Sequence, residues 1–118
     1  LVLAPLWKFV SADDPVWRAT VDFAFSEANA GGCYAGRLGS VHTRAPWPLG
    51  DVQSLIVGRI TGDESRVAVA MHNLQQAARI ADALPEAYDA DTGRTRSRHW
   101  FVWPGAALVC AVTGAFEE

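Results

Sequence analysis

Two stretches of the sequence, residues 27–47 and 85–103, contain the side chains whose types could do chemistry. They comprise one carboxylate, one histidine, one arginine, one threonine and three tryptophans: His42, Thr43, Trp47, Glu86, Arg98, Trp100 and Trp103. Tryptophan rings cover the apolar faces of sugar rings, while carboxylates and other polar groups bind the hydroxyls. A carboxylate can also act as a general acid or base. This combination favours carbohydrate chemistry.

Each of these side chains also has an ordinary structural interpretation. Taken alone, Glu86 is a loop or helix-cap carboxylate, and His42 is a hydrogen-bonded structural histidine. Tryptophans lie in hydrophobic cores more often than against ligands. Arg98 has two equally good partners, because it can orient Glu86 or pair with Asp89. Residue type alone leaves these alternatives open.

Four helices are predicted to position the two stretches, over residues 15–26, 48–61, 63–83 and 104–114. Pro15 and Pro48 suit the first turn of a helix, Asp63 is a good cap, and Gly62 is a helix stop. Apolar residues then recur at helical spacing. No alternating pattern of strand type appears, although residues 98–103 could be locally extended. We therefore predict an all-α fold.

The two chemically rich stretches are long loops in this scheme, and each joins one helix to the next. Long loops without secondary structure are uncommon in compact domains and are usually functional or disordered. Their aromatic residues argue against disorder. We therefore expect the two loops to lie on one rim of a helical array and to face a common ligand.

Composition excludes several classes of function. The net charge is −3 with no basic block, which argues against a nucleic-acid partner. Cys33 and Cys110 are too few and too far apart for a disulfide framework or a metal site, so we expect reduced thiols. No apolar run is long enough to span a membrane. The sequence does not determine the cellular compartment, although we favour the cytoplasm.

At this point the sequence resembles a known family, glycoside hydrolase family 125. Five short motifs occur in the family's order: Asp13-Asp14-Pro15-Val16-Trp17-Arg18-Ala19-Thr20 with Phe25-Ser26 and Asn29, Gly39-Ser40-Val41-His42-Thr43, Trp47-Pro48-Leu49, Pro85-Glu86-Ala87-Tyr88-Asp89, and Ser97-Arg98-His99-Trp100-Phe101-Val102-Trp103. The last two are similar to the family's His-Glu-Ser-Phe-Asp and Thr-Arg-Pro-Trp-Phe-Ala-Trp segments. The resemblance covers nearly the whole chain.

The resemblance implies a fold, a substrate and the absence of cofactors. The family contains metal-independent exo-α-1,6-mannosidases built on a barrel of six inner and six outer helices. Residues 1–118 would be the C-terminal part of such an (α/α)6 barrel, without an internal domain boundary. The partners would be a terminal α-linked mannose or similar sugar and the missing N-terminal part of the same barrel. Half of the residues are hydrophobic, which fits a surface that packs against further chain.

The resemblance also implies roles for individual residues. Glu86 stands where the family has its general base, and the other six side chains would bind the sugar. An inverting glycosidase needs a second carboxyl group, placed roughly 6.5–9.5 Å from the base, to protonate the leaving oxygen. The family's acid is an Asp that would precede Leu1. We therefore expect this chain alone to be inactive.

The sequence departs from the family's pattern near the site. Pro85 replaces a His, Val41 replaces a Pro, and Ala30 replaces the Pro after Asn29. These changes affect the expected sugar specificity more than the expected fold. A glycosidase of another sugar specificity on the same barrel is one alternative, and a non-catalytic carbohydrate-binding or partner-binding helical domain is another. A second acid facing Glu86 would distinguish an enzyme from a binding domain.

Overall fold

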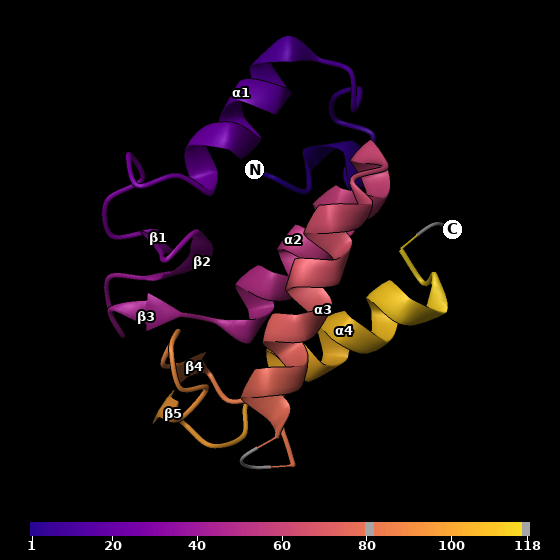
Figure 1. Ribbon diagram of the computed structural model, residues 1–118. Coiled ribbons are helices and arrows are strands. Elements are labelled where there is room, and N and C mark those ends of the chain that lie inside the picture. Colours follow the sequence, from indigo (N-terminus) through magenta and orange to yellow (C-terminus); the bar gives the residue numbers. More distant parts are fainter. Residues whose placement is uncertain (80–81, 117–118) are drawn as a thin grey trace.

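The computed structural model describes residues 1–79 and 82–116 (Figure 1). Within them the chain forms one short 3-10 helix, four α-helices and five short strands. In chain order these are η1 (Ala4–Trp7), α1 (Pro15–Ala24), β1 (Cys33–Tyr34), β2 (Arg37–Ser40), β3 (Ala45–Pro46), α2 (Pro48–Thr61), α3 (Glu64–Ala78), β4 (Ala87–Tyr88), β5 (Thr95–Ser97) and α4 (Val102–Thr113).

The predicted all-α fold, part of a helical barrel, is wrong, because the described residues form a mixed α/β structure. Strands β1, β2 and β3 make an antiparallel sheet in that order, and β4 pairs antiparallel with β5. Ala35 and Gly36 join β1 to β2 with φ angles of 52° and 73°. Two consecutive positive φ angles suit the tight hairpin turn that matches the twist of two strands. Strands of two to four residues are too short to show an alternating pattern.

The helix predictions are confirmed in number, and partly in their limits. α2 has the predicted bounds, since Pro48 begins it and Gly62, at a φ of 70°, ends it. α1 ends at Ala24, two residues before the predicted end. α3 ends at Ala78, so the helix predicted up to residue 83 is wrong at 79, 82 and 83, while residues 80 and 81 lie outside the described residues. α4 begins at Val102, so the extended conformation expected up to residue 103 is wrong, and the extended residues are those of β5.

α2 lies at the centre of the molecule and carries the core. Its Val52, Leu55 and Ile56 form one buried cluster with Leu74 of α3 and Ala111 of α4. Because α2 and α3 run in opposite directions, the start of α2, the end of α3 and the start of α4 lie at the same end of the molecule (Figure 1). Both small sheets lie at that end.

A second cluster attaches α1 to the other end of α2. Trp17 and Val21 of α1 pack with Val2 and with Val57 of α2, and the Trp17 indole Nε1 donates to the Val2 carbonyl oxygen at 3.1 Å. Asp14 caps α1, because its carboxylate accepts from two free backbone N–H groups of the first turn, those of Val16 and Trp17. In the described part of the chain, none of the helices combines the length and apolar character that a membrane span requires.

Candidate functional site

The two chemically rich stretches meet at one end of the molecule. Strand β3 of the first stretch contacts β4 of the second, and both lie beside the start of α2 (Figure 1). The β4–β5 hairpin follows α3, and its last residues lead directly into α4. Side chains more than forty residues apart in the sequence are thereby brought to the same end of the helices.

Glu86 lies just before β4 and is nearly buried, with 7% of its surface exposed. Its Oε2 accepts a hydrogen bond from the Ser97 hydroxyl and lies 3.4 Å from Nε of Arg98. Its backbone N–H donates to the Arg98 carbonyl oxygen at 3.0 Å. The other carboxylate oxygen, Oε1, has no hydrogen-bond partner among the described residues. Oε2 of Glu86 is therefore anchored, and the Glu86 side chain lines none of the hollows described below.

Arg98 pairs with Glu86 and not with Asp89, whose carboxylate lies 3.9 Å from Arg96 instead. Arg98 adopts a φ of 43°, a left-handed conformation that costs a non-glycine residue free energy. Its guanidinium is mostly exposed, so the pair is open to solvent on the arginine side. Asp89 accepts from the backbone N–H groups of Asp91 and Thr92 and so closes the β4–β5 turn.

Thr43 and Trp47 are joined directly. The Trp47 indole Nε1 donates to Oγ1 of Thr43 at 2.8 Å, which fixes the tryptophan ring beside β3. His42 is exposed in the same turn, and its backbone N–H donates to the Ser40 hydroxyl at 3.1 Å. The Thr43 side chain therefore lies against Trp47.

An aromatic row connects the two stretches. Trp47 packs edge-on against Phe101 with ring centroids 6.0 Å apart, and Phe101 lies 4.9 Å from Trp103. Trp103 is 61% exposed and Trp100 is exposed further still. Phe101, which was not among the predicted site residues, is thus the contact that places Trp47 and Trp103 in one surface.

A small cavity of about 170 Å³ lies beside Trp47. It is lined by Leu38, Gly39, Trp47, Leu49, Gly50 and Gln53. Gly50 is required there, because a Cβ atom at this position would lie 2.4 Å from the Leu38 carbonyl oxygen. The Gln53 amide is the polar side chain of this lining, so a hydroxyl group seated against Trp47 would find both a donor and an acceptor.

Sequence reasoning missed a buried polar cluster behind the site. Asp51, in the first turn of α2, is only 2% exposed. Its two oxygens accept from the Tyr88 hydroxyl at 2.5 Å and from Nδ2 of Asn73 at 3.0 Å. Burial raises the pKa of Asp51 to about 6, although the bonds from Tyr88 and Asn73 and the charge of Arg37 oppose this rise. One signal in the sequence could have indicated this burial: Asp51 precedes the core residue Leu55 by four residues, and residues at that spacing share one face of a helix.

Tyr88 connects this cluster to both sheets. Its hydroxyl receives a hydrogen bond from Nη1 of Arg37 at 3.3 Å, and the same nitrogen donates to the Ala90 carbonyl oxygen at 3.2 Å. Desolvation, followed by the Asp51 charge, raises the pKa of Tyr88 far above its ordinary value. Tyr88 therefore stays protonated, and its hydroxyl donates a hydrogen bond to Asp51.

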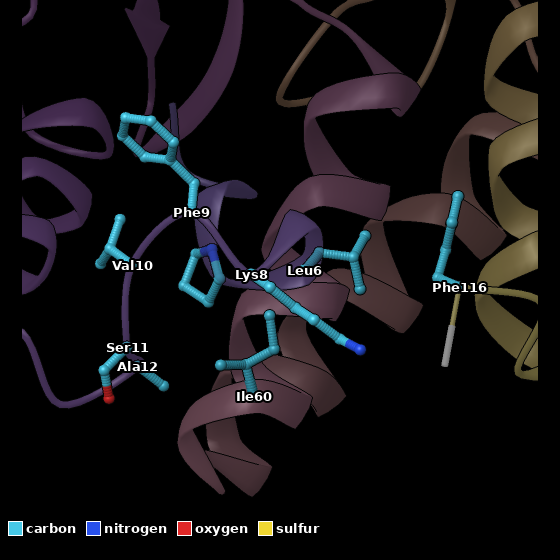
Figure 2. Close-up of a pocket in the computed structure, with 9 residues that line it drawn as sticks. Leu6, Lys8, Phe9, Val10, Ser11, Ala12, Ile60 and Phe116 are labelled. Carbon is cyan, nitrogen blue, oxygen red and sulfur yellow. The ribbon is translucent and has the colours of Figure 1, made fainter. Parts of the chain in front are cut away.

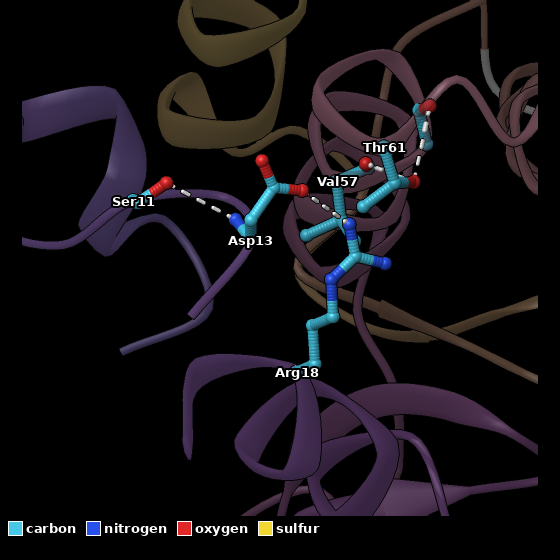
Figure 3. Close-up of polar contacts among 6 residues, drawn as sticks. Ser11, Asp13, Arg18, Val57 and Thr61 are labelled. Atoms are coloured by element: carbon cyan, nitrogen blue, oxygen red, sulfur yellow. Dashed lines mark hydrogen bonds and ion pairs between the residues drawn. The ribbon is translucent and has the colours of Figure 1, made fainter. Parts of the chain in front are cut away.

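A larger hollow lies elsewhere in the described chain. It has a volume of about 770 Å³, and Figure 2 shows its lining from the first twelve residues, the end of α2 and Phe116. A second, more polar hollow of about 270 Å³ lies between α1 and the α2–α3 connection. Near it, Arg18 pairs with Asp13 at 3.0 Å, as Figure 3 shows. The predicted site residues line neither hollow.

The family described as metal-independent alpha-mannosidase (GH125) matches residues 1–112 of the chain. This match confirms the resemblance seen in the sequence motifs. No curated protein and no solved structure matches the chain. Among the described residues, no three His, Cys, Asp or Glu side chains lie close enough together to hold a metal ion.

Proposed function

Because the chain belongs to the metal-independent alpha-mannosidase family of glycoside hydrolases, we propose that it supplies Glu86 as the general base of an inverting α-mannosidase. The family match over residues 1–112 is the observation that carries this proposal. It rests on nearly the whole chain, whereas a single buried glutamate would support many interpretations.

The surroundings of Glu86 support the role of a base. Ser97 and Arg98 hold Oε2, so the carboxylate keeps a fixed orientation while Oε1 accepts a proton from water. The water oxygen bonds to the anomeric carbon as the glycosidic bond breaks, and the leaving oxygen takes a proton from a general acid. A base of this kind contacts one water molecule and needs no broad access to bulk solvent.

The general acid is a separate carboxyl group. Asp51 does not suit this role, because both of its oxygens are occupied and the side chain is buried. We propose that the acid comes from a part of the catalytic domain outside these residues, as the family resemblance implies. The exposed valines of α4, Val102, Val109 and Val112, would pack against that part.

The sugar is proposed to bind across the aromatic row. Trp47 and Trp103 offer ring faces to the apolar side of a mannose ring, while His42, Thr43 and Arg98 surround its hydroxyls. Trp100 would contact the next sugar or the aglycone, because it is exposed beside Phe101. Terminal α-linked mannose is the substrate class that the family description supports.

The decisive experiment is Glu86→Gln in the full-length protein, with α-1,6-linked mannobiose as substrate. Glutamine fills the same space but does not take a proton, so kcat should fall about 10²–10⁴-fold while KM changes little. NMR of the first product should show β-mannose in the parent enzyme. Near-normal turnover in the Gln variant would refute the role of Glu86, and an α-mannose product would refute inversion.

A further inference from the structure

Three elements of the fold meet at the Tyr88 hydroxyl, and a fourth joins through Asp51. Tyr88 itself is on β4, Asp51 is on α2, and Arg37 is on β2. Asn73 of α3 joins through Asp51, to which its amide donates at 3.0 Å. Tyr88 is completely buried, and the guanidinium of Arg37 lies 5.7 Å from the centre of its ring. The hydroxyl thus fixes β4 against both the helix pair and the first sheet.

The same strand determines where Glu86 points. Glu86 precedes β4 directly, and only Ala87 separates it from Tyr88. Ala87 pairs with Ser97 and Tyr88 pairs with Thr95 across the hairpin. Strand β5 therefore brings its last residue, Ser97, to the Glu86 carboxylate, and Arg98, the residue after β5, also reaches it. A shift of β4 would change the position of Glu86 relative to both groups that hold it.

We propose that Tyr88 is a positioning residue for the hydrolytic step: its hydroxyl, held between Asp51 and Arg37, fixes β4 and so directs Oε1 of Glu86 at the attacking water. This inference rests on the proposed function of Glu86. It assigns a role to a hydroxyl that the proposed chemistry does not use and that stands where the family's His-Glu-Ser-Phe-Asp segment has a Phe. Tyr88 touches neither the water nor the sugar, and it acts through the backbone that it shares with Glu86.

A purely structural role for Tyr88 predicts a different outcome. If the hydroxyl only stabilised the fold, its loss would lower the fraction of folded enzyme, while kcat per folded molecule would stay the same. If it positions Glu86, its loss loosens the contacts of the carboxylate with Ser97 and Arg98, so kcat per folded molecule falls while KM changes little. The turnover of the folded enzyme therefore separates the two roles.

The experiment compares Tyr88→Phe with Tyr34→Phe in the full-length protein, with α-1,6-linked mannobiose as substrate. Tyr34 is a matched control, because its hydroxyl bonds only to a local carbonyl, that of Gly31, at 3.3 Å. Tyr88→Phe should lower kcat roughly 10–100-fold, with KM within about twofold of the parent value, since a displaced base loses its alignment. Both constants refer to the folded enzyme, with the folded fraction measured by circular dichroism. Tyr34→Phe should change neither quantity.

A kcat per folded molecule that stays at the parent value in Tyr88→Phe would overturn the positioning role. If Tyr88→Phe loses its cooperative thermal transition, Arg37→Met decides, because it removes the second partner and leaves the Asp51–Tyr88 bond intact. The same fall in kcat at nearly constant KM would support the inference, and an unchanged kcat would overturn it. Full activity of Glu86→Gln, by contrast, would refute the proposed function itself.

Discussion

The two ends of the α2–α3 helix pair hold very different hollows. At one end, a wide hollow of about 770 Å³ is lined mainly by apolar side chains, with Lys8 as its charged residue (Figure 2). At the other end, a cavity of about 170 Å³ is lined by Trp47 and by residues at the start of α2, where Asp51 is buried. The predicted site residue Trp47 lines this smaller cavity, and none of the predicted site residues lines the larger hollow.

The difference follows from what each end requires of the sequence. Apolar side chains tolerate replacement when their volume is roughly kept, so an apolar hollow constrains the sequence weakly. A buried carboxylate must be matched by specific donors, because leaving it unpaired costs several kcal/mol. Asp51, Tyr88, Asn73 and Arg37 form such a matched set. The matched polar set around Asp51, rather than the size of the cavity, therefore distinguishes the end of the molecule that carries Glu86.

The largest expected effect is a loss of stability when the buried cluster around Asp51 is broken. Asp51→Ala removes the acceptor of two buried donors, the Tyr88 hydroxyl and the Asn73 amide. The free energy of unfolding in urea should fall by about 3 kcal/mol. Phe9→Ala removes a larger side chain at the wide hollow, but Phe9 is highly exposed and the change should stay within about 0.5 kcal/mol. Equal effects of the two substitutions would remove the contrast between the ends.

The second prediction concerns the pH dependence of stability. The pKa of Asp51 is raised from its ordinary 3.8 to about 6 by burial, so the native state binds this proton more tightly than the unfolded chain. The associated stability is fully present below about pH 4 and is lost as the pH rises through about 6, a change on the order of 3 kcal/mol. Asp51→Asn should abolish this decrease, which urea unfolding at pH 4 to 7 would measure.

Asp89 provides a control of opposite sign. Hydrogen bonds from Thr92 lower the pKa of Asp89, so its contribution to stability is present above its ordinary pKa and is lost as the pH falls. Asp89→Asn should therefore leave the decrease between pH 4 and 6 in place. If Asp89→Asn removed that decrease and Asp51→Asn did not, the assignment to Asp51 would be wrong.

The sequence indicated the helices better than the site. Pro48 and Gly62 mark α2 at both ends, and such local signals act within a few residues. The strands depend on turns with positive φ at Ala35 and Arg44, residue types that give no signal for such a conformation. Asp51 is paired with Tyr88, which comes from a segment thirty-seven residues away. Contacts of that range follow from tertiary structure and are not visible in local periodicity.

The family motifs singled out Glu86 and Arg98, and the structure shows how the two side chains are held together. Ser97 holds the same carboxylate oxygen, although serine next to arginine gives no signal in the sequence. Phe101 joins Trp47 to Trp103 for a similar reason, since a single phenylalanine has a core interpretation by default. Sequence reasoning therefore found the charged and aromatic ends of each contact but not the residues that connect them.

The third prediction tests the aromatic row. Trp103→Ala removes one ring face from the proposed sugar platform, so KM for α-1,6-linked mannobiose should rise about tenfold, in line with 1–3 kcal/mol for one stacking contact. Trp7→Ala is the matched control, because Trp7 of η1 is 67% exposed and Trp103 is 61% exposed. Trp7→Ala should leave KM unchanged. Equal changes in both variants would show that exposed tryptophan in general, and not this row, affects binding.

The smallest effect is expected at the start of α1, remote from both the buried carboxylates and the aromatic row. Asp14 accepts from the backbone N–H groups of Val16 and Trp17, so Asp14→Ala should lower the free energy of unfolding by about 1 kcal/mol. Asp13 pairs with Arg18 at 3.0 Å, but both side chains are at least half exposed (Figure 3). Asp13→Ala should cost less than about 0.5 kcal/mol, because water and salt screen the pair.

Repeating both measurements in 1 M salt sharpens this last comparison. Screening at that ionic strength should remove most of any Asp13 effect, while the cap bonds of Asp14 are short-range hydrogen bonds and should persist. An Asp13 variant that is less stable than the Asp14 variant at low and high salt would contradict the assignment of α1's stability to its cap. Neither variant should alter kcat, because α1 packs at the end of α2 opposite to β4 and Glu86.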